Sequence, residues 1–83
     1  MTQQRPFYKT WRNDWDGVLG ASAERFLRNN PNAVAVLAFK DEHGRLCVEE
    51  YATPCVEHVR GPHNMPHAYS IAIRHLRTSH PAV

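Results

Sequence analysis

Residues 33–52, AVAVLAFKDEHGRLCVEEYA, decide the fold class because they predict a β-hairpin. The apolar run from Ala33 to Phe39 suits a central strand that is covered on at least one face. The segment from Asp41 to Gly44 is typical of a turn, since aspartate begins turns well and glycine supplies a positive φ at their end. Arg45 to Ala52 then alternates apolar and polar residues, as expected of a returning strand.

Upstream of the hairpin, the sequence predicts an amphipathic helix from about Trp15 to Asn29. Its expected buried face repeats at spacings of three and four and comprises Trp15, Val18, Leu19, Ser22, Ala23 and Phe26. Asp14 or Asp16 is expected to cap this helix, because a short carboxylate accepts hydrogen bonds from the free amides of the first turn. Trp11 and Trp15 are four residues apart, and we interpret them as core or dimer contacts.

Downstream of the hairpin, we expect a third strand and a second helix. Cys55–Arg60 follows Pro54 and is expected at a sheet edge, because proline cannot donate to a strand ladder. The second helix is expected to begin near Asn64, which would cap it, and to place His67, Ser70, Arg74 and Arg77 on its polar face. Its apolar stripe comprises Met65, Tyr69, Ala72, Ile73 and Leu76.

These elements predict a small two-layer α+β domain. The order is helix, strand, strand, third strand, helix, with both helices packed on one face of an antiparallel sheet. This order resembles that of the double-stranded-RNA-binding domain, although Pro66-His67-Ala68 stands where that family has a lysine-rich helix start. We divide the chain into an N-terminal basic and aromatic arm, residues 1–13, and a single domain, residues 14–80.

Composition narrows the class of protein further. At 83 residues the chain has room for one hydrophobic core, and its 42% hydrophobic content predicts a folded globular protein. The sequence contains no apolar run long enough to span a bilayer and no secretory signal, so we expect a cytoplasmic protein. Two cysteines are too few for a disulfide scaffold and are expected as free thiols.

Charge is distributed unevenly along the chain. All eight carboxylates lie between Asp14 and Glu57, together with only four basic residues. The first 13 residues and the segment from His58 to Val83 are basic and contain no acid. The formal net charge of +2 is nevertheless too small to require a nucleic-acid partner.

Our leading hypothesis is a small non-catalytic binding protein, a regulator or inhibitor of the kind that bacteria and their phages encode. It would dock a cationic surface of the second helix and the preceding loop onto another macromolecule, most simply a protein, and self-association is a further option. The partner-binding residues expected on that surface are Arg60, His63, His67, Arg74 and Arg77. The charges would steer encounter and orient the partner.

Two other functions are open at the level of sequence. A nucleic-acid-binding module would use the N-terminal arm and the last arginines, namely Arg5, Lys9, Arg12, Arg74 and Arg77. A minimal nuclease would use His63 and His67 with Arg74.

Candidate cofactor and metal chemistry is sparse. The only cluster with ligand-like residue types comprises Cys47, Cys55, His58, His63 and His67, and it lacks the C-x-x-C spacing of structural zinc sites. A glycine-rich phosphate loop is also missing from the sequence. We therefore predict no metal, no cofactor and no catalytic residue.

Overall fold

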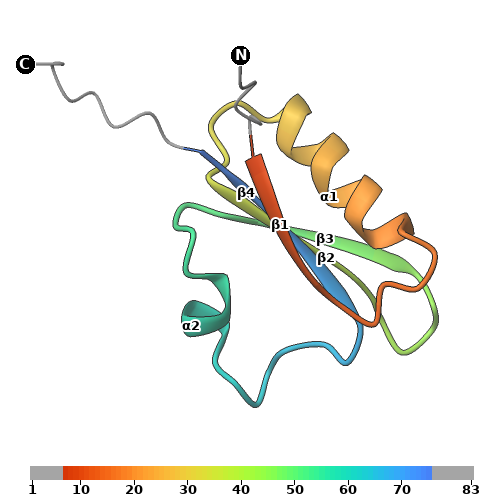
Figure 1. Cartoon of the computed structure of the whole chain (residues 1–83). Coiled ribbons are helices and arrows are strands. Elements are labelled where there is room, and N and C mark those ends of the chain that lie inside the picture. The colour runs from red at the N-terminus through yellow and green to blue at the C-terminus, as the bar shows by residue number, and fades with distance from the viewer. Residues whose placement is uncertain (1–6, 76–83) are drawn as a thin grey trace, which may run out of the picture.

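The computed structural model describes residues 7–75, which form an α+β domain with one antiparallel sheet (Figure 1). The predicted fold class is therefore confirmed. In chain order the elements are β1 (Phe7–Arg12), α1 (Val18–Asn29), β2 (Ala35–Lys40), β3 (Leu46–Tyr51), α2 (Val56–Arg60) and β4 (Tyr69–Arg74).

The sheet is built around its last strand. Its spatial order is β1-β4-β2-β3, and every neighbouring pair is antiparallel. Because β1 and β2 are both antiparallel to β4, they run in the same direction, and α1 connects them across it. This arrangement is a split β-α-β unit with the final strand inserted between its two halves.

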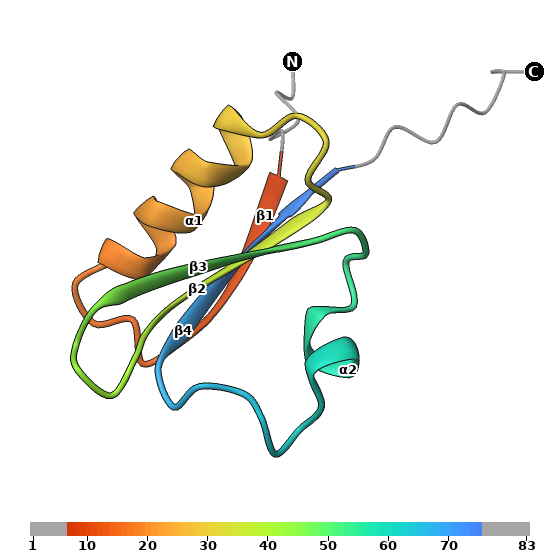
Figure 2. The same cartoon turned by 180° about the vertical axis from the view of Figure 1, so that it is seen from behind.

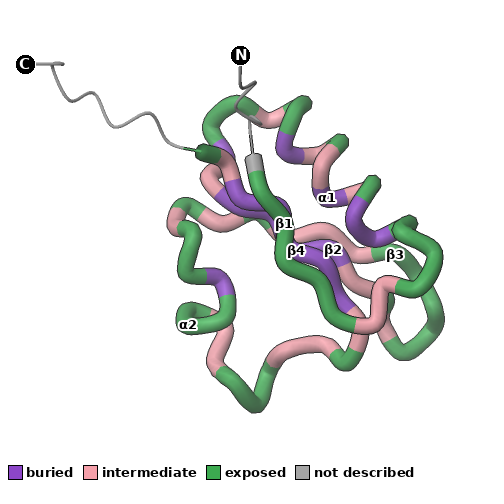
Figure 3. The backbone as a smooth tube through the Cα atoms, in the orientation of Figure 1, coloured by how far each residue is buried: buried purple, intermediate pink, exposed green. Residues whose placement is uncertain are grey.

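The two faces of the sheet carry separate apolar clusters. On one face, Leu19, Ala23 and Leu27 of α1 pack against Val36, Ala38 and Ala72. On the other face, Val56 of α2 packs against Leu37 and against Tyr69, Ile71 and Ile73 of β4. Figures 1 and 2 show α1 and α2 on opposite sides of the sheet, and Figure 3 shows that the most buried backbone runs along β4, β2 and the inner side of α1.

The central hairpin forms as predicted. The Asp41 carboxylate accepts hydrogen bonds from the backbone N–H groups of His43 and Arg45, each at 2.9 Å. Gly44 adopts a positive φ of 77°, which a residue with a side chain rarely adopts. These contacts fix the turn and hence the register, in which Ala38 of β2 lies opposite Val48 of β3.

Helix α1 also forms, but it begins at Val18 rather than at Trp15. Gly17 adopts the left-handed conformation directly before it and so ends the preceding turn. The N-cap position is Gly17 rather than an aspartate, but both aspartates before it accept hydrogen bonds from amides of the first turn, as predicted. Asp14 accepts from the N–H groups of Leu19 and Gly20 at 3.1 and 2.9 Å, and Asp16 accepts from that of Val18 at 3.1 Å.

The predicted second helix is wrong, because residues 69–74 form β4. Tyr69, Ala72 and Ile73 fit a helical stripe, but Tyr69, Ile71 and Ile73 fit strand alternation equally well. Aromatic and β-branched residues favour a strand. The strand prevails because both of its faces are covered, with Ser70 and Ala72 fully buried on the α1 side.

The predicted third strand is wrong as well, and so is the placement of both helices on one face. Val56–Arg60 forms the short helix α2, which follows Pro54 and ends at Gly61 with φ at 91°. Only Val56 of this segment is buried, so it lacks the alternating apolar pattern that would hold a strand in a sheet. The Val56 side chain anchors α2 to the face opposite α1.

The last residues of the predicted N-terminal arm lie within the sheet. Phe7–Arg12 forms β1, an edge strand that pairs with β4 along its whole length. The exposed side chains of Tyr8 and Trp11 lie on opposite faces of this strand, since successive residues alternate. The basic and aromatic residues of this segment therefore do not form one continuous surface.

Among residues 7–75, neither helix combines the length and the apolar character that crossing a bilayer would require.

The aspartate at the start of α1 provides a test of this local structure. We expect Asp14→Ala to lower the free energy of unfolding by about 1–2 kcal/mol, because two amides of the first turn lose their acceptor. Asp16→Ala is the matched control and should have a smaller effect, since Asp16 accepts a single exposed bond. Urea denaturation measures both, and an equal loss in the two variants would contradict the role given to Asp14.

Candidate functional site

The residues predicted to bind a partner are not gathered on one surface. The prediction placed His67, Arg74 and Arg77 on one helix face, and that helix does not exist. Arg60 lies at the end of α2, while His63 and His67 lie in the loop before β4. Arg77, like Arg5 of the nucleic-acid hypothesis, lies outside the described residues.

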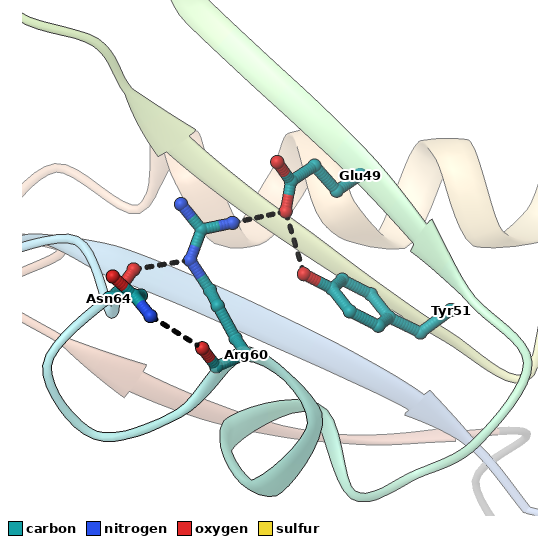
Figure 4. A network of polar contacts seen from close by, with 4 residues as sticks. All are labelled: Glu49, Tyr51, Arg60 and Asn64. Atoms are coloured by element: carbon teal, nitrogen blue, oxygen red, sulfur yellow. Dashed lines mark hydrogen bonds and ion pairs between the residues drawn. The ribbon is translucent and has the colours of Figure 1, made fainter.

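Arg60 belongs to a polar network within the chain (Figure 4). Its guanidinium forms an ion pair with Glu49 of β3 and donates to the backbone carbonyl of Asn64. The Tyr51 hydroxyl donates to the same Glu49 oxygen at 2.7 Å, and the Arg60 guanidinium lies 5.1 Å from the centre of the Phe39 ring. These contacts attach the end of α2 to the sheet, so Arg60 has a structural role.

The network sets the ionisation of Glu49. Burial alone would raise the pKa of this carboxyl group, but the hydrogen bonds from Tyr51 and Arg60 and the charge of Arg60 outweigh it and lower the pKa below the ordinary 4.5. The pKa of Tyr51 is raised by burial and by its bond to Glu49. Glu49 is therefore a fixed carboxylate rather than a group poised for proton transfer.

Arg74 is also turned toward its own chain. Its guanidinium donates to the carbonyl of Ala33 at 3.0 Å, to that of Asn30 at 3.1 Å and to that of Leu27. The last carbonyls of a helix have no partner within the helix, and a cation there also complements the helix dipole. Arg74 thus closes the C-terminal end of α1 from the end of β4.

The residues of the alternative nucleic-acid surface are likewise divided. The Lys9 ammonium lies 2.9 Å from the Glu24 carboxylate of α1, on the α1 side of the sheet. Arg12 is exposed, but it belongs to the set of β1 residues that face the other side. Of the three predicted cations within residues 7–75, Lys9 and Arg74 are thus engaged with their own chain, which leaves Arg12.

The histidine and cysteine candidates do not assemble into a reaction or metal site. His67 precedes β4 and Arg74 ends it, so the length of the strand separates them by roughly 20 Å. Within residues 7–75, no three His, Cys, Asp or Glu side chains come close enough to hold a metal ion. Cys47 and Cys55 are free thiols.

The turn between β1 and α1 forms a different candidate site, which we call the Trp15 corner. The Trp15 side chain is 92% exposed. Beside it lies a cavity of about 260 Å³ lined by Asn13, Asp14, Trp15, Asp16, Leu19, Lys40, His67 and Ala68. Asn13, which has a positive φ of 57°, donates its side-chain amide to the His67 carbonyl at 3.1 Å and so holds the loop before β4 against this turn.

The Trp15 corner carries a lysine and a histidine side chain that are available. Asp14 and Asp16 are engaged with the amides of α1. Lys40 and His67 are exposed, and their side chains show no hydrogen bond or ion pair with other residues of the 7–75 range. An indole beside a lysine and a histidine can bury apolar surface and meet a negative charge at the same time.

Sequence reasoning missed most of this site. The sequence predicts His67 as a partner-binding residue, but its pattern does not indicate Lys40 and favours a core or dimer contact for Trp15. The sequence does not show where α1 begins. A helix that began at Trp15, three residues earlier, would have turned this side chain toward the sheet. Lys40 and His67 lie 27 positions apart, and only the pairing of β2 with β4 brings them to one cavity.

Comparison with known proteins adds no relative: the chain matches no protein-family model, no curated protein and no solved structure.

The role of Arg74 is open to direct test. We expect Arg74→Met, which keeps most of the apolar stem, to lower the free energy of unfolding by about 1.5–3 kcal/mol, because part-buried carbonyls lose a charged donor. Arg25→Met on the exposed surface of α1 is the control and should change it by less than about 0.5 kcal/mol. Urea denaturation checks both, and indistinguishable midpoints would rule out this contribution.

The pH dependence of stability should report on Glu49. A carboxyl group whose pKa is lower in the folded state stabilises the fold above its unfolded pKa, and this stabilisation is lost as the pH falls through the folded pKa. We therefore expect wild-type stability to decline as the pH drops below about 4.5, with a smaller decline in Glu49→Gln. Chemical denaturation across this range measures the difference.

Glu50→Gln is the matched control for that series, because Glu50 is exposed on the opposite face of β3. It should retain the wild-type decline. If Glu49→Gln shows the same acid sensitivity as the wild type, the ion pair contributes nothing measurable to folding.

Proposed function

We propose that this chain is a small binding protein, without catalysis of its own, that docks onto another protein through the Trp15 corner. The observation that carries this proposal is the near-complete exposure of Trp15 beside a cavity. Tryptophan is among the residues that contribute most to binding energy at protein interfaces. A partner that covers this side chain removes apolar surface from water, which lowers the free energy of the complex.

The charges at the corner favour a partner of defined character. Lys40 carries a positive charge and no ion pair within residues 7–75, whereas the carboxylates of Asp14 and Asp16 accept hydrogen bonds from amides of α1. A complementary surface would present an apolar recess for the indole and carboxylates beside that recess. Opposite charges of this kind raise the association rate and fix the orientation of the complex.

A regulatory or inhibitory role in the cytoplasm, as in small bacterial or phage proteins, is the setting that we propose. Free thiols at Cys47 and Cys55 are typical of a reducing compartment. A nucleic-acid-binding module is the second candidate, supported by Arg12 and Tyr8, which are both exposed on the same face of β1. It has less support, since affinity for nucleic acid scales with the number of phosphates neutralised.

A site-specific crosslinker distinguishes the corner from other surfaces. We expect p-benzoylphenylalanine at position 15 to capture a discrete protein in cells of the source organism. The same crosslinker at position 59 should not capture it, because Val59 is exposed on α2, which packs on the face of the sheet opposite α1. Capture of the same proteins with equal yield from both positions would refute the assignment.

Once that protein is purified, titration gives the energetics. Trp15→Ala should weaken binding by about thirtyfold or more, as expected of an interface hot spot, and Val59→Ala on α2 should leave it unchanged. Fluorescence anisotropy with duplex and single-stranded oligonucleotides at low salt tests the second candidate. Saturable binding that is lost in Arg12→Glu and retained in Trp15→Ala would favour nucleic acid over the protein partner.

A further inference from the structure

Strand β1 is an open edge of the sheet that carries exposed residues of complementary chemistry. It pairs with β4 on one side, and no described strand lies on the other. All of residues 8–12 are exposed, including Trp11 at 67% and Tyr8 at 46%. Figure 1 shows β1 beside α1 rather than beneath it. An uncovered edge of this kind is a template for pairing with a further strand.

The sheet geometry shows which backbone groups face outward. The N–H of Arg74 donates to the carbonyl of Val34, so the even-numbered residues of β4 bond to β2. In an antiparallel sheet, successive residues of a strand direct their backbone N–H and carbonyl groups to opposite sides. The odd-numbered residues of β4 therefore bond to β1. Their β1 partners are Tyr8, Thr10 and Arg12. The N–H and carbonyl groups of Lys9 and Trp11 therefore point away from the sheet.

We infer that β1 pairs antiparallel with β1 of a second copy of this chain, about a twofold axis through Thr10. On the α1 side of the sheet, Lys9 then lies opposite Trp11 of the second copy. On the α2 side, Tyr8 lies opposite Arg12 of the second copy. Each copy thus places the Arg12 guanidinium over an aromatic ring. It also places the aliphatic part of Lys9, whose ammonium stays paired with Glu24, against the indole.

The register follows from symmetry and charge. A twofold axis perpendicular to the sheet keeps both α1 helices on one side. Each odd-numbered residue then lies opposite an odd-numbered residue of the second copy, and each even-numbered residue opposite an even-numbered one. A register centred on Lys9 would place two ammonium groups opposite each other, which is destabilising. A register centred on Trp11 would place Lys9 opposite Asn13, which has left the strand with φ at 57°. The Thr10 register avoids both and bonds Lys9 to Trp11 through their outward backbone groups.

This self-association is separate from docking at the Trp15 corner. Trp15 lies in the turn after β1 and takes no part in the paired strands. A monomeric chain that still binds its partner through Trp15 would overturn the dimer and leave the proposed function intact. A chain that dimerises but binds its protein partner equally well without the Trp15 side chain would overturn the proposed function and leave the dimer intact.

Two substitutions at one position test the backbone pairing. Lys9→Ala and Lys9→Pro both lose the ion pair with Glu24, but only proline loses the outward N–H. The bonds from β1 to β4 are spared in both, because Lys9 faces away from β4. In sedimentation velocity of the full chain from micromolar to millimolar, wild type and Lys9→Ala should dimerise. Lys9→Pro should raise the dissociation constant by about tenfold or more.

Circular dichroism must show the same secondary structure in the three proteins, and an independent crosslink tests the register. In a Cys47→Ser, Cys55→Ser background, Thr10→Cys should form a disulfide dimer on mild oxidation, because a non-bonded pair brings two Cα atoms to about 4.5 Å. Lys9→Cys should crosslink poorly. A wild-type chain that is monomeric throughout, equal association of the two Lys9 variants, or preferential crosslinking of Lys9→Cys would each overturn the inference.

Discussion

The structure depends on a central strand that is covered on both faces. From Tyr69 to Ile73 every residue of β4 is buried, with large side chains toward α2 and the small Ser70 and Ala72 toward α1. Small residues there let the helix come close to the sheet. Gly20 of α1 continues this close approach, since a β-carbon at that position would lie 3.1 Å from the Asp14 carboxylate and 3.4 Å from the Ser70 hydroxyl. The Asp14 cap, the helix and the strand therefore fit together as one unit.

The arginines show how tertiary structure decides the role of a charged residue. Arg60 and Arg74 looked available in a segment that contains no acid, yet Glu49 of β3 and the carbonyls at the end of α1 engage them. A helix end needs donors for its last carbonyls, and a guanidinium offers five of them. Which cation supplies them depends on the strand that happens to end nearby. The charge pattern along the chain does not contain that information.

The sequence predicted what is local and failed where distant segments decide. The hairpin follows from a short apolar run, an aspartate turn and Gly44, and α1 follows from its amphipathic repeat. The segment containing β4 is short and apolar, so its periodicity fits a helix and a buried strand alike, and only its place between β1 and β2 resolves it. In the site, His67 was predicted, whereas Lys40 required the sheet register. The exposure of Trp15 required the first residue of α1, which is the kind of boundary that patterns locate poorly.

The sheet order has a consequence for how the molecule assembles. The strand that joins β1 to β2 is the last of the described strands, so the described residues before Tyr69 contain β1 and the β2–β3 hairpin without the strand that pairs with both. During synthesis, the β2–β3 hairpin and α1 are available early, but β1 has no pairing strand until Arg74 has left the ribosome. Pairing β1 with β4 closes a loop of some sixty residues. Folding is slow because the chain entropy of this loop is lost before the paired strands contribute stabilising contacts. The nascent chain therefore acquires its native core only after β4 has emerged, in one step that joins the two parts of the sheet.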